Sequence, residues 1–552
     1  MLDADPDAPV LSAPDPDTLA DAEHFAAEIA ALRDDGDPER FRRFRLVHGV
    51  YGIRNRDDRF MVRIKIPFGI LARRQWSALA DVADVCADRR AHLTTRQCVQ
   101  FHHVPLDCIP EVIRRVGEVG LTTREAAGNG VRNITSCPLA GICPHEVFDV
   151  RPLAAALVRH LLRNPLAQDL PRKFKISFSG CARDCALARI HDLGFVATVD
   201  TNGQPGFRLW AAGGLGAVPQ QAVPLSPFVP LHQVTAVADA TIAAFAQHGD
   251  RRNRARARLK FVAARLGGEG LRQTVAEQGQ LLGLTLPALG TFDPAAQPPS
   301  WPTPVTPPPA ASDRGLALWM TTNTVAQKQP GFAAVWIAPP GGNLAAVEMQ
   351  ALARLASDFG DGRLRLALSQ DVILPWIRTM DLPQLHQRLT GIGLGAPGAL
   401  RPANVTGCPG SATCNLAITA SNTLARELRR VLLERPEYGL ADDLADLRIR
   451  VSGCPNSCGH HQVGGIGLQG GSARVDGREM PVYRILLGGG AEAEDARFGT
   501  AVAQVPARHV PEAVLRILEV YRQDRAADEG FVRWARRRAA ERAPVAQMEK
   551  GE

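Results

Sequence analysis

The 552-residue chain lacks an uninterrupted apolar run of about eighteen residues, so the sequence predicts no membrane-spanning helix. Its first residues are acidic and rich in proline, without the basic start and apolar stretch of a secretion signal. The net charge is only +7, which gives no specific reason to expect a nucleic-acid partner. We therefore expect a cytoplasmic protein with no membrane partner and no nucleic-acid partner.

The eleven cysteines lack a disulfide pattern, because their number is odd and no secretion signal precedes them. Four of them form two pairs flanked by glycine and proline, Cys408 with Cys414 and Cys454 with Cys458. Thiolates are soft ligands that suit iron–sulfur clusters, and four complete one [4Fe-4S] cube. Paired zinc ligands usually stand about two to four residues apart, whereas five residues separate Cys408 from Cys414. The spacing therefore favours a cluster over zinc and indicates a redox protein.

The chain contains two copies of one unit. Five short motifs recur in the same order about 272 residues later. One pair is Asn133-Ile-Thr-Ser-Cys-Pro138 and Asn404-Val-Thr-Gly-Cys-Pro409; another is Ser179-Gly-Cys-Ala-Arg-Asp-Cys185 and Ser452-Gly-Cys-Pro-Asn-Ser-Cys458. Each copy thus carries one set of four cysteines at matching positions. The first-copy thiols are Cys137, Cys143, Cys181 and Cys185, and the second-copy thiols are Cys408, Cys414, Cys454 and Cys458.

Alternating helix and strand patterns predict compact α+β units. In the first copy we expect a helix over Thr18–Arg33 that begins at Asp17 or Thr18, a helix over Gln75–Asp88, and a strand over His92–Phe101. Between the copies, Thr291–Asp313 is rich in proline and predicts an extended spacer. The Gly465–Gly470 segment has dinucleotide-type glycine spacing but opens no helix, so we expect a strand and turn there.

The copies differ in positive charge near the thiols. The first copy carries four basic residues, which we call the cation cluster: Arg96, Arg132, Lys173 and Lys175. Their counterparts in the repeat are Ser369, Ala403, Asp446 and Arg448, so only the last position stays basic. Lys173 and Lys175 alternate along an extended segment and so point to one face. Buried cations are costly without anions. The sequence therefore predicts an anionic ligand that the first copy holds opposite the second-copy thiols.

These motifs together resemble the sirohaem-dependent nitrite and sulfite reductases. The resemblance rests on Thr94-Thr-Arg-Gln97, Arg132-Asn133, Lys173-Phe-Lys175 and the second-copy cysteine motifs, and it extends over roughly residues 40–525. It implies an internally duplicated α+β fold with two ferredoxin-like half-domains and two sirohaem/[4Fe-4S]-binding domains. The expected limits are a tail and helix over 1–40, half-domains over 41–115 and 314–390, sirohaem/cluster-type domains over 116–290 and 391–530, the linker over 291–313, and a basic tail over 531–552.

The resemblance also implies the roles of individual residues. Cys408, Cys414, Cys454 and Cys458 would bind the [4Fe-4S] cluster, and Cys458 would also bridge to the sirohaem iron. The cation cluster would grip the substrate anion. Further cofactor contacts are expected from Thr94, Gln97, Asn133, Gly489 and Gly490. No flavin- or nicotinamide-binding domain is predicted, so a ferredoxin-like or other external carrier would supply the electrons.

Three questions stay open on the sequence. The first-copy thiols, absent from many members of the family, predict either a second [4Fe-4S] cluster or thiols left over from the duplication. Lys175 resembles the sulfite-reducing branch, where nitrite-reducing relatives often have asparagine, so sulfite is the first choice and nitrite the second. An enzyme of the precorrin-3B synthase type, or an electron carrier with clusters and no haem, are the remaining alternatives.

Overall fold

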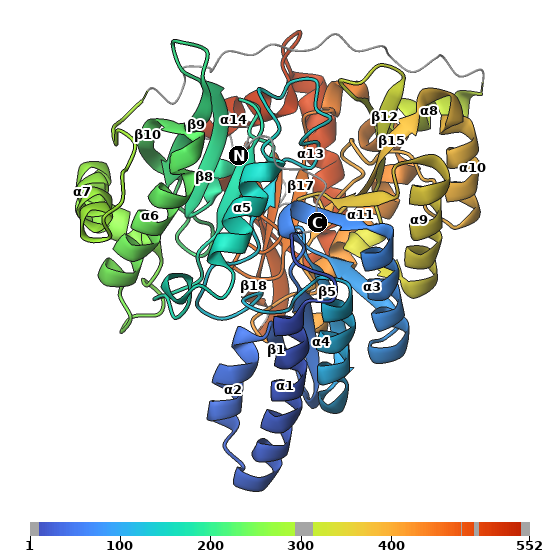
Figure 1. Ribbon diagram of the computed structural model, residues 1–552. Helices are drawn as coiled ribbons and strands as arrows, with labels where there is room; N and C mark the ends of the chain where they lie inside the picture. Colours follow the sequence, from blue (N-terminus) through green and yellow to red (C-terminus); the bar gives the residue numbers. More distant parts are fainter. Residues whose placement is uncertain (1–9, 293–312, 476, 491–495, 542–552) are drawn as a thin grey trace.

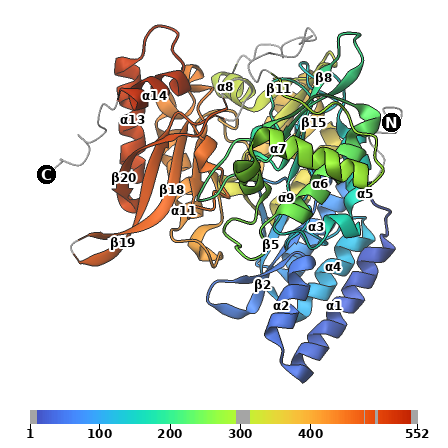
Figure 2. The ribbon, with the colours of Figure 1, turned by 90° about the vertical axis from the view of Figure 1, so that its left-hand side faces the viewer.

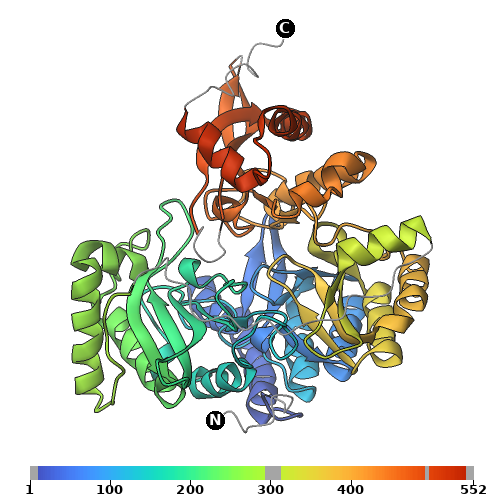
Figure 3. The same cartoon turned by 90° about the horizontal axis from the view of Figure 1, so that it is seen from above.

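The computed structural model describes residues 10–292, 313–475, 477–490 and 496–541. Four five-stranded sheets organise these residues. Viewed from above, the first-copy domain in green, the second half-domain in yellow and the last domain in orange and red surround the blue N-terminal half-domain (Figure 3). Among the described helices, none is long and apolar enough to cross a membrane.

The two half-domain sheets exchange one strand. The first runs β1 (Val50–Ile53), β2 (Arg56–Ile64), β5 (Val99–Pro105), β4 (Arg90–Leu93) and β13 (Asn343–Ala345). The second runs β11 (Thr324–Ala326), β12 (Phe332–Ile337), β15 (Val372–Arg378), β14 (Arg363–Leu366) and β3 (Ile70–Ala72). β13 comes from the second copy and β3 from the first, so each copy completes the sheet of the other.

The half-domain helices form one shared core. They are α3 (Arg73–Cys86), α4 (Ile109–Glu118), α8 (Arg314–Asn323), α9 (Ala346–Phe359) and α10 (Leu382–Gly391). Related residues of α3 and α9 meet directly, since Trp76 Nε1 donates to the Met349 carbonyl at 2.8 Å. Both side chains are fully buried. The half-domains therefore stabilise each other as a single hydrophobic unit.

The remaining two sheets share one topology. The first-copy sheet runs β6 (Thr135–Ser136), β7 (Ile176–Ser179), β8 (Leu193–Val199), β9 (Pro205–Ala211) and β10 (Val223–Pro230). The second-copy sheet runs β16 (Thr406–Gly407), β17 (Ile449–Ser452), β18 (Ile466–Val475), β19 (Arg478–Leu487) and β20 (Thr500–Pro506). In both, the first three strands are parallel and the last two antiparallel. The cysteine loops follow the first two strands of each sheet.

Helices cover these two sheets. They are α5 (Arg151–Leu161), α6 (Val234–His248) and α7 (Leu259–Leu281) in the first copy, and α11 (Ser421–Glu434), α12 (Pro436–Gly439), α13 (Val510–Asp524) and α14 (Phe531–Ala540) in the second. In Figure 2 the long β18–β19 hairpin stands to one side with α13 and α14 along it. Gly465–Gly470 forms the start of β18, so the predicted strand is confirmed there.

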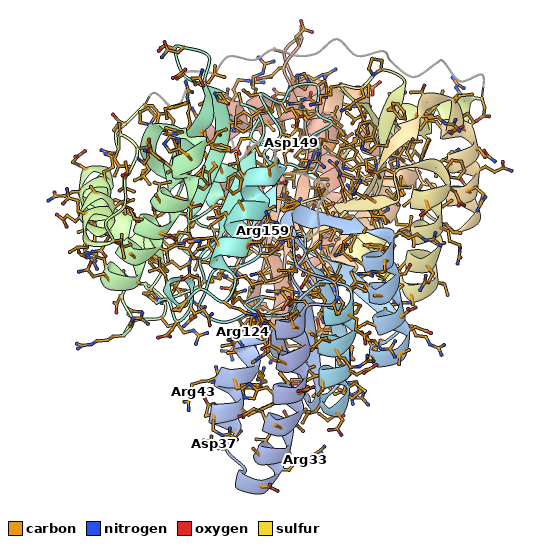
Figure 4. The ribbon with its side chains drawn as sticks, in the orientation of Figure 1. Arg33, Asp37, Arg43, Arg124, Asp149 and Arg159 are labelled. Carbon is orange, nitrogen blue, oxygen red and sulfur yellow. The ribbon has the colours of Figure 1, made fainter. Side chains whose placement is uncertain are left out.

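An arm of two helices, α1 (Pro16–Asp35) and α2 (Pro38–Val47), extends below the molecule in Figure 1. Arg33 and Asp37 lie at its far end, and Arg124 lies where it joins the body (Figure 4). Phe25 and Ile29 of α1 are buried in the half-domain core. The helix begins earlier than predicted: Asp15, not Asp17 or Thr18, is its N-cap, and its side chain accepts from the Thr18 N–H.

One further expectation was wrong. The strand expected over His92–Phe101 is a β4–β5 hairpin, because the chain turns at Thr94–Cys98 and Gln97 takes a left-handed φ of 50°. The basic segment expected from Phe531 begins with the helix α14, which packs Phe531 and Trp534 into the core of the last domain. An apolar side on this helix outweighs its arginines. Most of the proline-rich spacer, residues 293–312, lies outside the described residues.

Candidate functional site

The copies meet where the first-copy turn Thr94–Cys98 touches the second-copy cysteine loop. Thr95 Oγ1 donates to the carbonyl of Cys458 at 2.8 Å. Nearby, Gln462 Nε2 donates to the Gly216 carbonyl at 2.7 Å. These contacts join residues more than two hundred positions apart in the sequence. They place first-copy cations and second-copy thiols on facing elements, as the sequence predicts.

Hydrogen bonds fix the turn that carries Arg96. The hydroxyl of Thr94 accepts from the backbone N–H groups of Arg96 and Cys98, both at 3.2 Å. Asn133 Nδ2 donates to the Arg96 carbonyl at 3.0 Å and to the Ile66 carbonyl at 2.7 Å. In the structure Thr94 and Asn133 thus act as positioning residues for Arg96; their contact with a cofactor stays a prediction.

Arg96 lies between a histidine and a strand. Its Nη1 is 2.6 Å from His191 Nε2, and its Nη2 donates to the Ile176 carbonyl at 3.1 Å. His191 Nδ1 lies 2.6 Å from the Leu187 carbonyl, which assigns the proton to Nδ1 and leaves Nε2 to accept from Arg96. Burial lowers the pKa of Arg96 to about 9. A guanidinium in this setting gains from any anion that approaches it.

Arg132 is held from the opposite side. Its Nη1 donates to the Ala126 carbonyl at 3.0 Å, and its Nη2 donates to the Gly128 carbonyl at 2.7 Å and lies 3.3 Å from the hydroxyl of Tyr51. Only 8% of Arg132 is exposed. The backbone contacts fix the guanidinium while providing no negative charge to balance it.

Lys173 and Lys175 flank the buried Phe174 just before β7, so both side chains project to the face opposite Phe174. Burial, followed by the charge of Arg258, lowers the pKa of Lys173 to about 8, although the Cys458 thiolate acts in the other direction. Burial and the charges of Lys173 and Arg96 hold the pKa of Lys175 well below its ordinary value. Lys173 therefore interacts electrostatically with Cys458, and Lys175 with Lys173 and Arg96.

Positive charge exceeds negative charge in this region. Asp192 is buried there, and its Oδ2 accepts from Arg258 Nη2 at 2.6 Å. Within the described parts of the chain, no member of the cation cluster makes an ion pair with a carboxylate. Enclosed cations that repel one another are stabilised when an anion binds among them. The arrangement can hold a small oxyanion or the carboxylates of a larger ligand.

The second-copy thiols lie in the loops after β16 and β17. Cys408 and Cys454 are buried, Cys414 is half-buried, and Cys458 is exposed. Backbone N–H groups point at the sulfurs: Gly453 N donates to Cys408 Sγ at 3.3 Å, Leu416 N to Cys414, and Asn456 N to Cys454. Burial, and then the charge that Cys458 would carry, raises the pKa of each of the other three. Four sulfurs that share one space and accept N–H bonds suit a cluster.

Two glutamines tie the cysteine loops to the half-domains. Gln97 Nε2 donates to the carbonyls of Ser136 and Leu366, at 3.0 and 2.8 Å, and its Oε1 accepts from Ser136 N at 3.0 Å. Gln370 mirrors it, accepting from Gly407 N at 2.9 Å and donating to the Leu93 carbonyl at 2.8 Å. Both polar atoms of the Gln97 side chain therefore bond to the backbone, and a contact between Gln97 and a cofactor stays a prediction.

The predicted glycines lie at the end of β19. A Cβ on Gly489 would lie 2.5 Å from the Gly464 carbonyl and 2.7 Å from that of Gln462. Its counterpart Gly213 is equally crowded, with the Arg189 carbonyl at 2.5 Å. Gly490 pairs with Arg497 in an isolated bridge. Close backbone packing therefore explains the paired glycine in both copies, and cofactor contact at Gly489 and Gly490 stays a prediction.

Tyr51 and His191 contact the cation cluster but were not predicted from the sequence. Burial would raise the pKa of Tyr51, but Arg132, Arg63 and Lys173 outweigh it and lower that pKa to about 7. No motif marks Tyr51, and only its strand register places it there. Arg258 lies within the basic run Arg251–Lys260, whose first six residues are exposed and whose Arg258 and Lys260 are buried.

Comparisons with known proteins agree with this architecture. A family model described as the nitrite and sulphite reductase 4Fe-4S domain matches residues 127–280 and 399–539. A second, described as the nitrite/sulfite reductase ferredoxin-like half domain, matches residues 53–119 and 325–392. The matches alternate along the chain, which confirms the duplicated fold and its two kinds of domain.

Curated relatives have both substrate names. The chain is 32% identical to a ferredoxin–nitrite reductase of Synechococcus elongatus, over 90% of this chain and 92% of the relative. It is 30% identical to a sulfite reductase [ferredoxin] of Mycolicibacterium paratuberculosis, over 87% of this chain and 82% of that protein. Among solved structures, the NirA protein of Mycobacterium tuberculosis matches with a TM-score of 0.77 and 28% identity, over 91% of this chain and 90% of that chain.

Matched family models over most of the chain, relatives of nearly full length and a solved structure with the same fold lead to one conclusion. The chain belongs to the sirohaem-dependent nitrite and sulfite reductase family and is an oxidoreductase of that family, with sirohaem and [4Fe-4S] as its cofactors.

Proposed function

We propose that this enzyme reduces sulfite to sulfide, with nitrite reduction to ammonium as the second candidate. Each reaction consumes six electrons by oxidation-state arithmetic, together with protons. The observation that supports the proposal is the pair of lysines, Lys173 and Lys175, that faces Arg96 and the Cys458 loop without a carboxylate partner among the described residues.

The chain's own residues fit both cofactors. The second-copy thiols would hold the cluster, and the Cys458 thiolate, the exposed one of the four, would also serve the sirohaem iron. The carboxylates of sirohaem would meet an excess of buried cations, including Arg258. Nε of Arg96, Arg132 and Arg258 is buried without a hydrogen-bond partner among the described residues. When bound, the two cofactors supply the electrons that the anion takes up.

The cation cluster would bind and orient the anion. Arg96 and Arg132 are fixed by backbone carbonyls, so they attract the oxyanion with little reorganisation. Lys173, with its pKa near 8, can both carry charge and release a proton close to neutral pH. The phenol of Tyr51, with a pKa near 7, is a second proton donor beside Arg132. Protons can then reach oxygen atoms of the anion as they leave as water.

The second lysine favours sulfite. Sulfite carries up to two negative charges and nitrite one, so a site with an additional cation gains more from sulfite. Lys175 is that cation, held near Lys173 and Arg96. Nitrite stays a candidate because the chain is also 30% identical to an assimilatory ferredoxin-dependent nitrite reductase of Haloferax mediterranei.

The electron donor in this proposal is a ferredoxin-type protein, as the names of the relatives state for them. The second-copy cysteine loop exposes 69% of Leu416 and 45% of Ile418. Arg54 lies beside them and donates to the Ala417 carbonyl. Exposed apolar side chains with a cation at the edge suit a transient acidic partner. The predicted cytoplasmic location fits a donor of this kind.

The test compares the two anions with one enzyme preparation. The holoenzyme is assayed without oxygen, with reduced methyl viologen and then with reduced ferredoxin, and kcat/KM is measured for sulfite and for nitrite. We expect a higher kcat/KM for sulfite. Lys175→Asn should lower the sulfite value about 30-fold, for one charged contact of ~2 kcal/mol, and the nitrite value less than about threefold. Arg448→Asn, at the corresponding position of the second copy, serves as the control.

A higher kcat/KM for nitrite in the wild-type enzyme would reverse the choice of substrate. Unchanged sulfite turnover in Lys175→Asn would remove that lysine from the site. A sirohaem-containing protein that turns over neither anion would instead favour the precorrin-3B synthase type of chemistry.

A further inference from the structure

We propose that the first-copy thiols bind a second [4Fe-4S] cluster, one with no sirohaem beside it. The proposal does not depend on which anion the enzyme reduces. It concerns the first-copy thiols, none of which belongs to the cation cluster: Cys137, Cys143, Cys181 and Cys185.

The first-copy thiols occupy the same place in the fold as the second-copy thiols. Cys137 N donates to the Phe178 carbonyl at 2.9 Å, which continues the β6–β7 pairing into the cysteine loop. Cys408 N donates to the Val451 carbonyl at 3.2 Å and continues the β16–β17 pairing in the same way. The backbone therefore delivers both sets of sulfurs by the same pairing of parallel strands.

The loops after β7 and β17 also share an unusual backbone. Asp184 and Leu187 have left-handed φ values of 51° and 61°, and their counterparts Ser457 and His460 have 58° and 61°. Non-glycine residues adopt this conformation rarely and at a cost of about 1 kcal/mol or more each. A leftover of the duplication would have no reason to keep it. The first copy thus retains the strained loop shape that presents Cys181 and Cys185.

N–H groups point at the sulfurs in both copies at the same offset. The backbone N–H of His145 donates to the Cys143 thiol, and that of Arg183 donates to the Cys181 thiol. Both donors stand two residues after the cysteine, as Leu416 and Asn456 do after Cys414 and Cys454. N–H bonds to the cysteine sulfurs are a general feature of iron–sulfur sites and tune their potential.

The four sulfurs converge in an enclosed space. Cys137, Cys143 and Cys181 are at most 5% exposed, and Cys185 is half-buried. The thiols of Cys137 and Cys185 lie within hydrogen-bonding reach of each other, and so do those of Cys143 and Cys181. Four thiolates can share such a space only if cations lie between them. A [4Fe-4S] core supplies that charge.

A single metal ion fits less well. Among the residues that the structure describes, no group of three or more His, Cys, Asp or Glu side chains is placed to hold one ion. Five residues separate Cys137 from Cys143, beyond the usual spacing of paired zinc ligands of about two to four. The larger span of a cube, with iron and sulfide in the middle, agrees with both observations.

The second half-domain closes over this site. Lys328 N donates to the Ile142 carbonyl at 3.0 Å, and Lys328 Nζ pairs with the buried carboxylate of Glu146 at 2.6 Å. Arg365, only 1% exposed, donates through Nη1 to the carbonyls of Pro138 and Ala140, at 3.1 and 2.8 Å. These contacts hold the Arg365 guanidinium beside the loop that begins at Cys137, where its charge would offset part of the negative charge of a cluster with four thiolates.

A second sirohaem has no comparable support. Ser369, Ala403 and Asp446 stand where the first copy has Arg96, Arg132 and Lys173. Arg448 remains, but its Nη1 donates to the carbonyls of Ala445 and Leu447, at 2.7 and 3.0 Å. Of the four positions of the cation cluster, the second copy thus keeps one cation, and this cation bonds to carbonyls, so the proposed site is a cluster alone.

The proposed cluster would take up one electron from the reduced donor, which loses one electron, and its core charge would fall by one.

The decisive measurement is the composition of the full-length wild-type holoenzyme, purified without oxygen. We expect about eight acid-labile sulfides and about nine irons per chain, the ninth being the sirohaem iron. About four sulfides and about five irons, or one zinc per chain, would overturn the proposal.

Matched variants locate the cluster. Cys185→Ser should lose about four sulfides per chain while the sirohaem absorption stays, because only the first-copy site is changed. Cys108→Ser, a half-buried thiol outside both sets, should keep the full content. Cys143→Ser is prepared as a second single variant. Full sulfide content in both Cys185→Ser and Cys143→Ser would contradict a cluster at the first-copy thiols. If either variant fails to fold, the wild-type sulfide count and a redox titration of its one-electron couples still decide. Normal anion turnover with only four sulfides would reject the second cluster and leave the proposed function intact.

Discussion

The two copies of the repeat have the same backbone fold but differ in the charged side chains near their thiols. Both retain four cysteines in matching loops, a glutamine tie to the other half-domain and left-handed residues at equivalent positions. Around the thiols they differ. The first copy supplies cations that face the second-copy thiols, whereas Ser369 and Ala403 stand at two of those positions in the second copy.

The difference extends to groups outside the motifs. Tyr51 pairs with Met61, and Val325 pairs with Ala334. The strand register therefore makes Val325 the second-copy equivalent of Tyr51. Where Cys98 lies in the first copy, the second has Asp371, whose carboxylate accepts from Asn404 at 3.0 Å and 2.9 Å. In the proposed function, the first-copy residues attract the anion and protonate it, and the corresponding second-copy residues do not. Duplication thus provided a symmetric scaffold on which a single asymmetric site is built.

The largest effect should come from the second-copy thiols. Cys454→Ser removes a cluster ligand at the site that faces the cations, so turnover should fall below about 1% of wild type, since electrons lose their route to the anion. The corresponding Cys181→Ser should keep more than about a tenth of the turnover. Both are measured anaerobically with reduced methyl viologen and corrected for sirohaem content. Equal losses in the two variants would mean that the copies contribute alike.

The next effect tests the charge asymmetry. Arg132→Ala should lower kcat/KM for sulfite and nitrite about 30-fold, or ~2 kcal/mol for one charged contact. Arg448→Ala in the second copy should change it by less than about twofold, because this side chain bonds only to nearby carbonyls among the described residues. Thermal unfolding and sirohaem absorption serve as controls for intact protein. A comparable loss in Arg448→Ala would show that the second copy also acts on the anion.

Lys173 predicts a pH dependence that the second copy cannot show, because Asp446 replaces it there. Burial and Arg258 lower its pKa to about 8, so the ammonium is charged below that pH and neutral above it. Affinity for an anion should therefore decrease as the pH rises. We expect kcat/KM for nitrite to fall above pH 8, by at most about tenfold per unit. Lys173→Arg, which stays charged, should move this fall to higher pH; an unchanged profile would exclude Lys173 as its cause.

Much of this asymmetry could be predicted from the sequence. Cysteine spacing predicts a cluster because thiolate geometry is local, and the repeat register pairs Arg96 with Ser369 without any structure. Periodicity also placed α3 within two residues of its observed ends. The features of the fold and site that depend on residues close in sequence could therefore be predicted.

Pairings between residues far apart in the sequence could not be predicted. The exchange of β3 and β13 between sheets depends on contacts across the whole chain and leaves no local pattern. The turn within the predicted strand at His92–Phe101 requires a left-handed glutamine, which no sequence rule marks because glycine usually takes that role. Tyr51 was missed for the same reason: its role comes from three cations, on other segments, that surround its phenol.

Tyr51 gives the smallest expected effect and the sharpest test of the first-copy site. Its pKa near 7 makes the phenol a proton donor at pH 6 and a phenolate beside Arg132 at pH 9. Tyr51→Phe should therefore lower kcat a few-fold at pH 6, by about 1 kcal/mol, and lower KM for the anion at pH 9, since a negative charge is removed. Val325→Ala, at the corresponding strand position, should do neither. A KM that is unchanged at pH 9 would place the Tyr51 charge outside the anion site, whereas opposite changes at the two pH values can come only from a group that titrates between them.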